Sequence, residues 1–358
     1  MTTDLECFRA TVEHRRPPRV LYYAGFTPDL KRRIREHIGC DDIAAHYGLW
    51  QRRHPDVGRR AGAQPPDYSP YWADVQLPEG TYINGVGVAM APGSMYHFRR
   101  YLSPLENARS LSDIESYPLE DPSDWLTDHL SAEVEAAHAE GLVAEGWVGH
   151  MYETAWQIRG YEQFLMDMVE RPSWAECLLE RLAARNAVRA EAFARAGADL
   201  IRCGDDVANQ RSLMFSPDMW RRMIHSRWSR IWRRVKEIHP CAVVWYHSDG
   251  NVAPIVGELV EDGLDILNPL QPECLDVDGI HRRYGHRLSF DGLMGTQSTM
   301  PHGSPDDVRR RVRDVLDRYG CDGGVIISPT HVLEPEVPLA NIDALFAACR
   351  DYGSAGDV

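Results

Sequence analysis

The sequence predicts an α/β protein, folded as a TIM (β/α)8 barrel with N-terminal elaborations. Short apolar runs, typical of strands buried on both faces, alternate with helical segments at intervals of about 20–45 residues. Six such strand–helix units lie between residues 142 and 351, and about two more fit before them. No Gly-x-Gly-x-x-Gly turn follows any of these strands, which disfavours the alternative, a doubly wound open sheet.

A chain of 358 residues is long enough for one large barrel, so we interpret residues 1–358 as a single domain. Its residues 1–130 form an irregular N-terminal part with the first strands. Residues 131–352 form the regular strand–helix units.

In the N-terminal part, strands are predicted at residues 19–23, within residues 79–90 and at residues 95–101. Thr27 is placed to cap a helix whose first position is Pro28. Residues 51–71 are rich in Pro, Gly, Arg and Asp and predict a long loop, and residues 111–125 predict a surface helix and a connector.

The regular part contains six predicted strands, at residues 142–148, 198–202, 243–246, 264–267, 288–290 and 325–327. Predicted helices lie between and after them, at residues 164–169, 173–196, 217–238, 252–261, 279–284, from 305 onward, and 339–351. Ser-Pro-Asp at residues 216–218 and again at 304–306 marks two of the helix starts.

Composition and charge exclude several classes of function. A formal net charge of −14 argues against a nucleic-acid partner, because neutralising phosphates requires a basic face. No apolar run approaches the length that a bilayer requires, and the first thirty residues lack a signal-peptide pattern. The eight cysteines form no Cys-x-x-Cys pair, which predicts reduced thiols in a cytoplasm. A monomer and a homodimer both stay open.

Polar residues follow the ends of all six regular strands. The most distinctive case is residues 243–250, where an apolar β-favouring run stops at His247, Ser248, Asp249 and Gly250. Any single case is explained by a helix cap or a turn. Ligands of parallel α/β folds bind at the carboxyl ends of the strands, so the repetition predicts one shared pocket. Its candidate residues are Tyr152, Glu153, Asp205, Asp206, His247, Asp249, Gln271, Glu273, Asp291, His331 and Glu334.

Several segments together form a distinctive pattern: 111–118 with Asp121-Pro122, 199–206, Ser216-Pro-Asp-Met-Trp220, Tyr246-His-Ser-Asp-Gly-Asn251, Asp265-Ile-Leu-Asn-Pro269 and Pro329-Thr-His-Val-Leu-Glu-Pro335 to Pro338. On these segments the chain resembles the uroporphyrinogen decarboxylase superfamily from about residue 101 to 352. Within that superfamily it looks most like the cobalamin-linked methyltransferase branch. The resemblance itself implies a TIM barrel.

Two departures from the family pattern bear on function. Uroporphyrinogen decarboxylases begin with an Arg-Gln-Ala-Gly-Arg segment that binds the porphyrinogen carboxylates, whereas this chain has Tyr22-Tyr-Ala-Gly-Phe26. The methyltransferase branch holds zinc through His-x-Cys and a later Cys. In this chain His247 matches the histidine, Asp249 stands at the first cysteine and His331 falls at about the second.

The resemblance therefore implies a divalent metal held by His247, Asp249 and His331, with Glu153 as a candidate fourth ligand. Imidazoles and carboxylates suit Zn²⁺, and also Fe²⁺ or Mn²⁺. The alternative is a site without metal, in which Asp249 and His331 serve as base and acid. Catalytic roles are assigned to Asp206, Glu153 and His331, and substrate binding to Asp205, Tyr152, Gln271, Glu273 and Asp291.

The leading functional hypothesis is metal-dependent methyl transfer or demethylation of a small polar compound, with a corrinoid protein as a candidate partner. The alternatives are decarboxylation of a small aromatic or heteroaromatic acid and a non-catalytic binding barrel. Strand alternation sends adjacent side chains to opposite sides. We therefore predict that Asp206 enters the pocket while Asp205 pairs with a neighbour such as Arg202.

Overall fold

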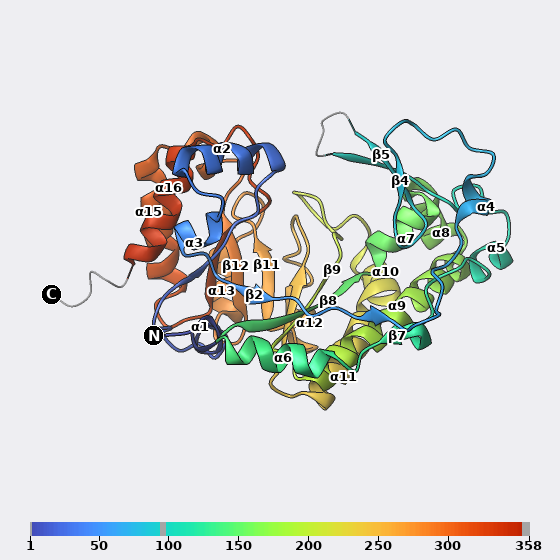
Figure 1. Ribbon diagram of the computed structural model, residues 1–358, viewed down its shortest axis with the longest axis horizontal. Coiled ribbons are helices and arrows are strands. Elements are labelled where there is room, and N and C mark those ends of the chain that lie inside the picture. Colours follow the sequence, from blue (N-terminus) through green and yellow to red (C-terminus); the bar gives the residue numbers. More distant parts are fainter. Residues whose placement is uncertain (1, 94–97, 353–358) are drawn as a thin grey trace.

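Eight parallel strands run in the order β1, β13, β12, β11, β10, β9, β8, β2 and curve into a barrel in the computed structural model, which describes residues 2–93 and 98–352 (Figure 1). The six regular strands are β8 (Val143–His150), β9 (Leu200–Gly204), β10 (Val243–His247), β11 (Ile266–Leu270), β12 (Ser289–Met294) and β13 (Val325–Pro329). The N-terminal part supplies β1 (Leu21–Tyr22) and β2 (Arg52–Arg53). The predicted TIM barrel, with two strands before the regular units, is confirmed.

The two short N-terminal strands sit at the ends of this order. β1 pairs with β13 and β2 pairs with β8, both in parallel. The N–H of Trp50 donates to the carbonyl of Tyr22 at 2.8 Å, which links the segment leading into β2 back to β1. This contact joins the two ends of the strand order.

The lower part of the barrel interior is apolar. Every second residue of a strand points inward, and the first inward residue of six strands belongs to one buried cluster: Leu21, Val143, Leu200, Val243, Ile266 and Ile326. The helix α1 (Asp4–Val12) adds Leu5, Cys7 and Phe8 to this cluster. A capping box between Thr3 and Glu6 fixes the start of α1. α1 therefore covers the amino-terminal end of the barrel interior, and the carboxyl ends of the strands lie at the opposite end.

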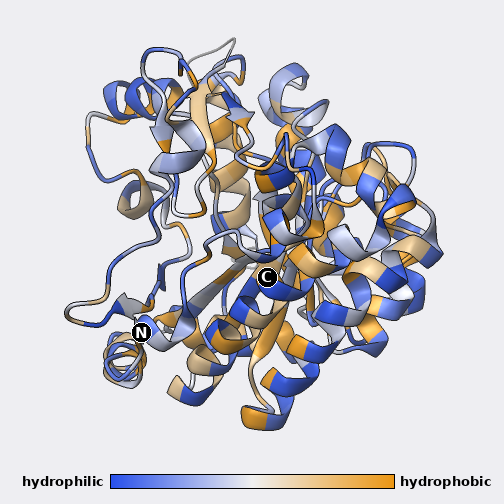
Figure 2. Cartoon of the chain, turned by 90° about the vertical axis from the view of Figure 1, so that its right-hand side faces the viewer, coloured by the Kyte–Doolittle hydropathy of each residue, from blue (hydrophilic) through white to orange (hydrophobic). Residues whose placement is uncertain are grey.

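Helices cover the outside of the strands. They are α6 (Leu130–Ala139), α7 (Tyr152–Arg159), α8 (Tyr161–Glu170), α9 (Pro172–Ala196), α10 (Pro217–Trp220), α11 (Ser226–Ile238), α12 (Val256–Glu261), α13 (Val277–Tyr284), α14 (Thr299–His302), α15 (Pro305–Tyr319) and α16 (Leu339–Asp351). Figure 2 shows hydrophilic and hydrophobic residues alternating along these helices, as expected for helices with one buried side. Trp228 and Trp232 of α11 pack against Tyr246 of β10, with ring centroids 6.2 and 5.4 Å apart.

The N-terminal elaboration forms two small antiparallel sheets. One pairs β3 (Gly58–Arg59) with β7 (Trp125–Leu126), and the other has the order β4 (Tyr82–Ile83), β5 (Ala89–Pro92), β6 (Arg99–Leu102). The short helices α2 (Pro28–Ile38), α3 (Ile43–Tyr47), α4 (Ser69–Trp72) and α5 (Leu111–Glu115) complete this part. Figure 1 shows β4 and β5 next to α7, and Tyr101 of β6 meets Trp156 of α7 with ring centroids 5.2 Å apart.

Three local predictions need correction. Residues 51–71 are not only a loop, because Arg52–Arg53 is a strand of the barrel. Both residues of this strand are charged, so it lacks the apolar run that predicts a buried strand. The Thr27 side chain does not cap α2, although Pro28 does occupy the first turn. The helix predicted at 217–238 contains a π-helical turn, η2 (Arg221–His225).

Two further points concern the limits of the described chain. The strand predicted at 95–101 is seen as β6, and residues 95–97 lie outside the described residues. Among the described helices, none combines the length and the apolar character needed to cross a bilayer.

Candidate active site

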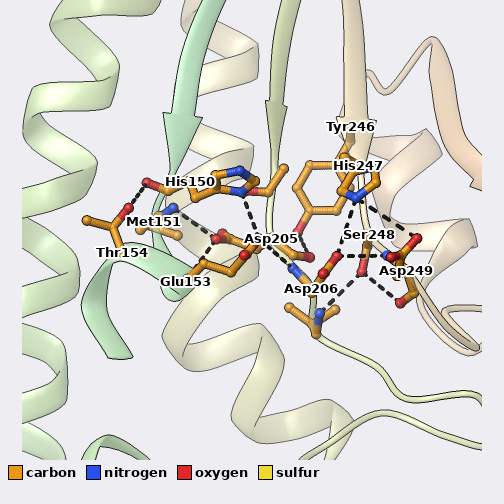
Figure 3. Close-up of polar contacts among 12 residues, drawn as sticks. His150, Met151, Glu153, Thr154, Asp205, Asp206, Tyr246, His247, Ser248 and Asp249 are labelled. Atoms are coloured by element: carbon orange, nitrogen blue, oxygen red, sulfur yellow. Dashed lines mark hydrogen bonds and ion pairs between the residues drawn. The ribbon is translucent and has the colours of Figure 1, made fainter. Parts of the chain in front are cut away.

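The carboxyl ends of the neighbouring strands lie in register. His150 of β8 pairs with Gly204 of β9, Gly204 pairs with His247 of β10, and His247 pairs with Asn268 of β11. Parallel pairing thus brings polar residues from distant parts of the sequence to one edge of the barrel (Figure 3). Two groups of metal-ligating residue types meet there: His150 with Glu153 and Asp205, and Asp206 with His247 and Asp249.

His150 and Glu153 form an ion pair within the first group. The Nδ1 atom of His150 lies 2.8 Å from Glu153 Oε1 and 2.8 Å from the carbonyl oxygen of Gly204. Burial opposes the charge on His150, but the Glu153 carboxylate outweighs it and raises the pKa of His150 to about 9. His150 in turn holds the pKa of Glu153 below its usual range, against the effect of burial. The imidazolium is therefore the stable form at neutral pH.

Asp205 is fully buried and anchors the start of α7 to the end of β9. Its carboxylate accepts hydrogen bonds from the N–H of Met151 at 2.9 Å, the N–H of Glu153 at 3.0 Å and the indole N–H of Trp228 at 2.7 Å. Burial raises the pKa of Asp205 to about 6, even though the nearby charge of His150 opposes that rise. The predicted pairing of Asp205 with Arg202 is wrong, because Arg202 contacts Glu145 inside the barrel instead.

The second group combines two carboxylates with one imidazole. The Nε2 atom of His247 lies 3.6 Å from Asp206 Oδ1 and 4.0 Å from Asp249 Oδ1, and the N–H of Asp249 donates to Asp206 Oδ1 at 2.8 Å. All three side chains are partly exposed, between 24% and 39%. The predicted pocket residue Asp206 is thus accessible, whereas Asp205 is not.

Asn268 fixes the orientation of the His247 ring. Its Oδ1 lies 2.6 Å from His247 Nδ1, and an amide oxygen can only accept, so Nδ1 carries the proton. The lone pair is then on Nε2, the atom that faces both carboxylates. A histidine that ligates a metal through one ring nitrogen usually donates a hydrogen bond from the other, which fixes its tautomer. The contact with Asn268 gives His247 this arrangement.

The electrostatics of this group favour a cation. Burial and then the charge of Asp206 raise the pKa of Asp249, while the nearby imidazoles of His247 and His331 oppose the rise. Two neighbouring carboxylates repel each other, and a cation placed between them stabilises their charged forms. One neutral imidazole nitrogen and two carboxylates are a donor set that suits Zn²⁺, Fe²⁺ or Mn²⁺. The residues present therefore fit a divalent metal.

The structure brings two of the three predicted metal ligands together and adds a different third. His247 and Asp249 share the cluster with Asp206. His331 follows β13, is exposed, and lies near enough for its charge to act on Asp249, but it is outside the cluster. Glu153, the candidate fourth ligand, is instead engaged by His150 and by the N–H of Asp206 at 3.2 Å.

The remaining predicted substrate residues hold the surrounding loops and core. Tyr152 is fully buried and packs against Phe164 and Phe215. Asp291 is also fully buried and accepts hydrogen bonds from Tyr23, Trp245 and Ser328 at 2.8–2.9 Å.

Gln271 and Glu273 bind neighbouring loop residues. Gln271 accepts from the N–H of Gly250 at 3.3 Å, and Glu273 accepts from the Ser298 hydroxyl at 2.7 Å. Their side chains thus fix the loops that follow β10 and β12.

Several residues of the site were not found by reading the sequence. His150 was not among the predicted site residues, although its spacing of three from Glu153 is that of an ion pair at a helix start. Trp147 and Arg202 alternate with known interior positions, and Asn268 follows a strand as the other candidates do. Tyr101 of β6 reaches the site from the elaboration, where its pKa is raised by burial and also by the charge of Glu153. No local pattern links Tyr101 to the barrel.

An α/β barrel with histidine and carboxylate side chains clustered at the carboxyl ends of its strands has the architecture of a TIM-barrel enzyme. Residues 85–352 match the model of the uroporphyrinogen decarboxylase family. The chain belongs to the uroporphyrinogen decarboxylase family, as its motifs predicted, and is an enzyme of that superfamily.

The chain is 24% identical over 331 residues to a uroporphyrinogen decarboxylase of Chloroflexus aurantiacus, covering 87% of each chain. It is 20% identical over 260 residues to the uroporphyrinogen decarboxylase of Coxiella burnetii, covering 70% of this chain and 69% of the relative. Among solved structures, a methyltransferase from Methanosarcina mazei superposes with a TM-score of 0.66 at 17% identity, covering 98% and 99% of the two chains. At this identity, the superposition shows the fold.

Proposed function

We propose that the protein is a metal-dependent methyltransferase or demethylase that acts on a small polar substrate at the mouth of the barrel. The observation that carries this proposal is the cluster of Asp206, His247 and Asp249, with His247 Nε2 left free to face both carboxylates. The methyltransferase from Methanosarcina mazei, which has the same fold over nearly its whole length, supports the choice of reaction class.

Asp206, His247 and Asp249 would hold the metal, and Asn268 would keep the imidazole in the ligating tautomer. When bound, a divalent metal supplies a Lewis acid that polarises a substrate oxygen or activates a thiol or water as nucleophile. Asp206, His247 and Asp249 include no thiolate, so this donor set is harder than that of the family's cysteine sites. Zinc is the metal that we propose, with iron or manganese as alternatives.

The ion pair of His150 and Glu153 shapes the other side of the site. Glu153 accepts the N–H of Asp206 at 3.2 Å and so fixes the backbone that carries this carboxylate. His150 holds a proton near the cluster at neutral pH. His331 stands exposed at the rim and is placed to give or take a proton at the substrate. These roles go beyond ligation and keep Asp206, Glu153 and His331 in the catalytic set.

The proposed reaction implies a substrate and a protein partner. The substrate is a small molecule, and a corrinoid protein is the methyl carrier that the methyltransferase branch implies. The segment Tyr22 to Phe26 carries no arginine, so a tetrapyrrole with many carboxylates is not the substrate proposed here.

A second candidate is decarboxylation of a small aromatic or heteroaromatic acid. It is favoured by the Asp206 carboxyl group, which is partly exposed at the mouth of the barrel beside His247. Asp206 or His331 would then protonate the carbon that loses carbon dioxide. The curated relatives that match the chain are decarboxylases, which also supports this candidate.

The test is the metal content of purified protein. The wild type should hold a stoichiometric divalent metal, and His247→Ala should lose it while its circular dichroism stays unchanged. His286→Ala is the matched control, because His286 is exposed and precedes β12 at the closed end of the barrel. A wild-type enzyme that is fully active in chelator would overturn the proposal. Assays of methyl transfer and of carbon dioxide release separate the two candidate reactions.

A further inference from the structure

A layer of charged residues lies inside the barrel, between the apolar floor and the metal-ligand cluster. Glu145 of β8 is 2% exposed and accepts hydrogen bonds from Arg52 at 2.7 Å and from Arg202 at 3.2 Å. Burial disfavours the charge of Glu145, but Arg52 first and then His54 and Arg202 outweigh it and lower its pKa to about 2. One carboxylate is thus shared by two guanidinium groups.

The other acid of this layer is hydrogen-bonded by neutral groups. Asp291 is engaged by three neutral donors, the Tyr23 and Ser328 hydroxyls and the Trp245 indole. No ion pair joins it to Arg52 or Arg202 in the part of the chain that the structure describes. Among the described residues, Glu145 is therefore the carboxylate that both arginines contact directly.

Arg202 is the arginine that faces the open end. Its side chain is 31% exposed, against 11% for Arg52. Leu200, two residues earlier on the same side of β9, lies in the buried floor, so this exposed surface opens toward the carboxyl ends of the strands. The guanidinium lies 4.1 Å from the centroid of the Trp245 ring, and its Nε is buried without a hydrogen-bond partner among the described residues.

Trp147 lies beside the Arg202 guanidinium. It is on the same side of β8 as Val143 and Glu145, the interior side, yet it is 36% exposed. The Arg202 guanidinium is 5.5 Å from its ring centroid, and the His150 ring meets its edge at 5.1 Å. A partly exposed indole at the mouth of a barrel offers a flat apolar surface to a ligand.

We propose that Arg202 and Trp147 form the binding subsite for a planar anion, which makes a small aromatic carboxylate the substrate class. A guanidinium binds a carboxylate through two parallel hydrogen bonds, and an indole face packs against an aromatic ring. Arg202 and Trp245 precede Gly204 and His247 by two residues on paired strands, so the subsite adjoins the metal-ligand cluster. This inference rests on the proposed function, since it names the substrate class of that same site.

The test uses chelator-treated protein and three probes: benzoate, its neutral analogue benzamide, and acetate as an anion without a ring. Affinities are measured by calorimetry and by quenching of tryptophan fluorescence. Benzoate should bind at least about tenfold more tightly than either of the other probes, because only benzoate engages both residues. Equal affinities of benzoate and benzamide, or of benzoate and acetate, would overturn the proposal, as would no binding of benzoate.

Variants assign the two contacts. Arg202→Gln should lower the affinity for benzoate by about tenfold or more and leave benzamide unchanged. Trp147→Leu should weaken both aromatic probes and remove most of the quenching. The matched control is Arg171→Gln, since Arg171 stacks on Trp174 at 4.8 Å on the outer helices; it should bind benzoate as the wild type does.

Misfolding of a variant and loss of metal can both be distinguished from loss of the anion-binding subsite. If Arg202→Gln fails to fold, Arg202→Lys and the three-probe series on the wild type still decide, because the lysine keeps the charge but not the two parallel bonds. Unchanged benzoate affinity in Arg202→Lys would count against the subsite. Because the probes are added without metal, a failed subsite is distinguishable from a failed metal proposal, which the metal content of His247→Ala tests alone.

Discussion

Asp205 and Asp206 leave the end of β9 on opposite sides and so meet different surroundings. Asp205 points outward to Trp228 of α11, whereas Asp206 stays at the mouth of the barrel beside His247. Arg202, three positions before Asp205, points inward to Glu145. The two residues expected to pair therefore lie on different sides of the strand, which is why the predicted ion pair does not form.

The first prediction compares two amide variants. Asp206→Asn should abolish or strongly reduce turnover and metal binding with little loss of stability, because its side chain is exposed and the amide keeps its shape. Asp205→Asn should instead lower the free energy of unfolding by about 1–3 kcal/mol, since its amide nitrogen would face buried N–H donors. Chemical denaturation and metal analysis of both variants check this. Equal and mild effects in both would show that the pair is only a turn.

The second prediction concerns pH. The pKa of His150 is raised in the folded protein, to about 9, so folding is favoured by its protonation. That contribution is fully present below the usual histidine pKa, near 6.5, and is lost as the pH rises through about 9. His150→Gln should therefore flatten the fall in unfolding free energy between pH 6.5 and 9. Urea denaturation across this range measures it, and the same slope in wild type and variant would contradict the assignment.

At the scale of elements, the close approach of β9 and β10 positions the metal-ligand cluster. A Cβ atom on Gly204 would lie 2.7 Å from the Cβ atom and from the carbonyl oxygen of His247. Both are atoms of a paired strand and cannot rotate away. Because Gly204 has no side chain, His247 can occupy its observed position in the metal-ligand cluster.

The third prediction follows from this contact. Gly204→Ala should displace His247 and weaken metal binding, while the variant still folds. Metal affinity is measured by competition with a chelator. Gly263→Ala is a useful control, since Gly263 precedes β11 at the closed end and an added Cβ there would meet only the flexible Lys236 side chain, although its φ of 101° adds strain. Wild-type metal affinity in Gly204→Ala would contradict the role given to this glycine.

How well elements were predicted depended on whether their signal is local. The helix α16 was placed at its observed bounds, and β10 was placed to within one residue, because the pattern of apolar residues within each segment is enough to identify it. The strand β2 was missed, because its two residues are arginines and its pairing with β8 is the only reason it is a strand. Asn268 was missed as a site residue for the same reason, since its role depends on the neighbouring β10.

At the scale of the whole molecule, segments far apart in the sequence complete one barrel. α1 fills its closed end, β1 pairs with β13, and β2 pairs with β8. The alternation of strands and helices was enough to predict this fold, because it recurs in six successive units. The position of the elaboration next to α7 was not predicted, because its contact through Tyr101 and Trp156 has no signature in either segment.

The fourth prediction tests the single domain expected for residues 1–358. Because the N-terminal strands pair with β8 and β13 of the regular part, the chain should unfold in one cooperative transition. Circular dichroism and tryptophan fluorescence should then give coincident denaturation curves. Two separated transitions would show that the elaboration and the barrel fold independently.

The central claim is that Asp206, His247 and Asp249 hold a divalent metal. Anomalous X-ray diffraction at the metal edge, on crystals of the active enzyme, tests it most directly. The claim predicts one anomalous peak among these three side chains, with their oxygen and nitrogen atoms about 2.0–2.2 Å from the ion. A peak at His150 and Glu153 instead, or active crystals with no peak at the cluster, would contradict it.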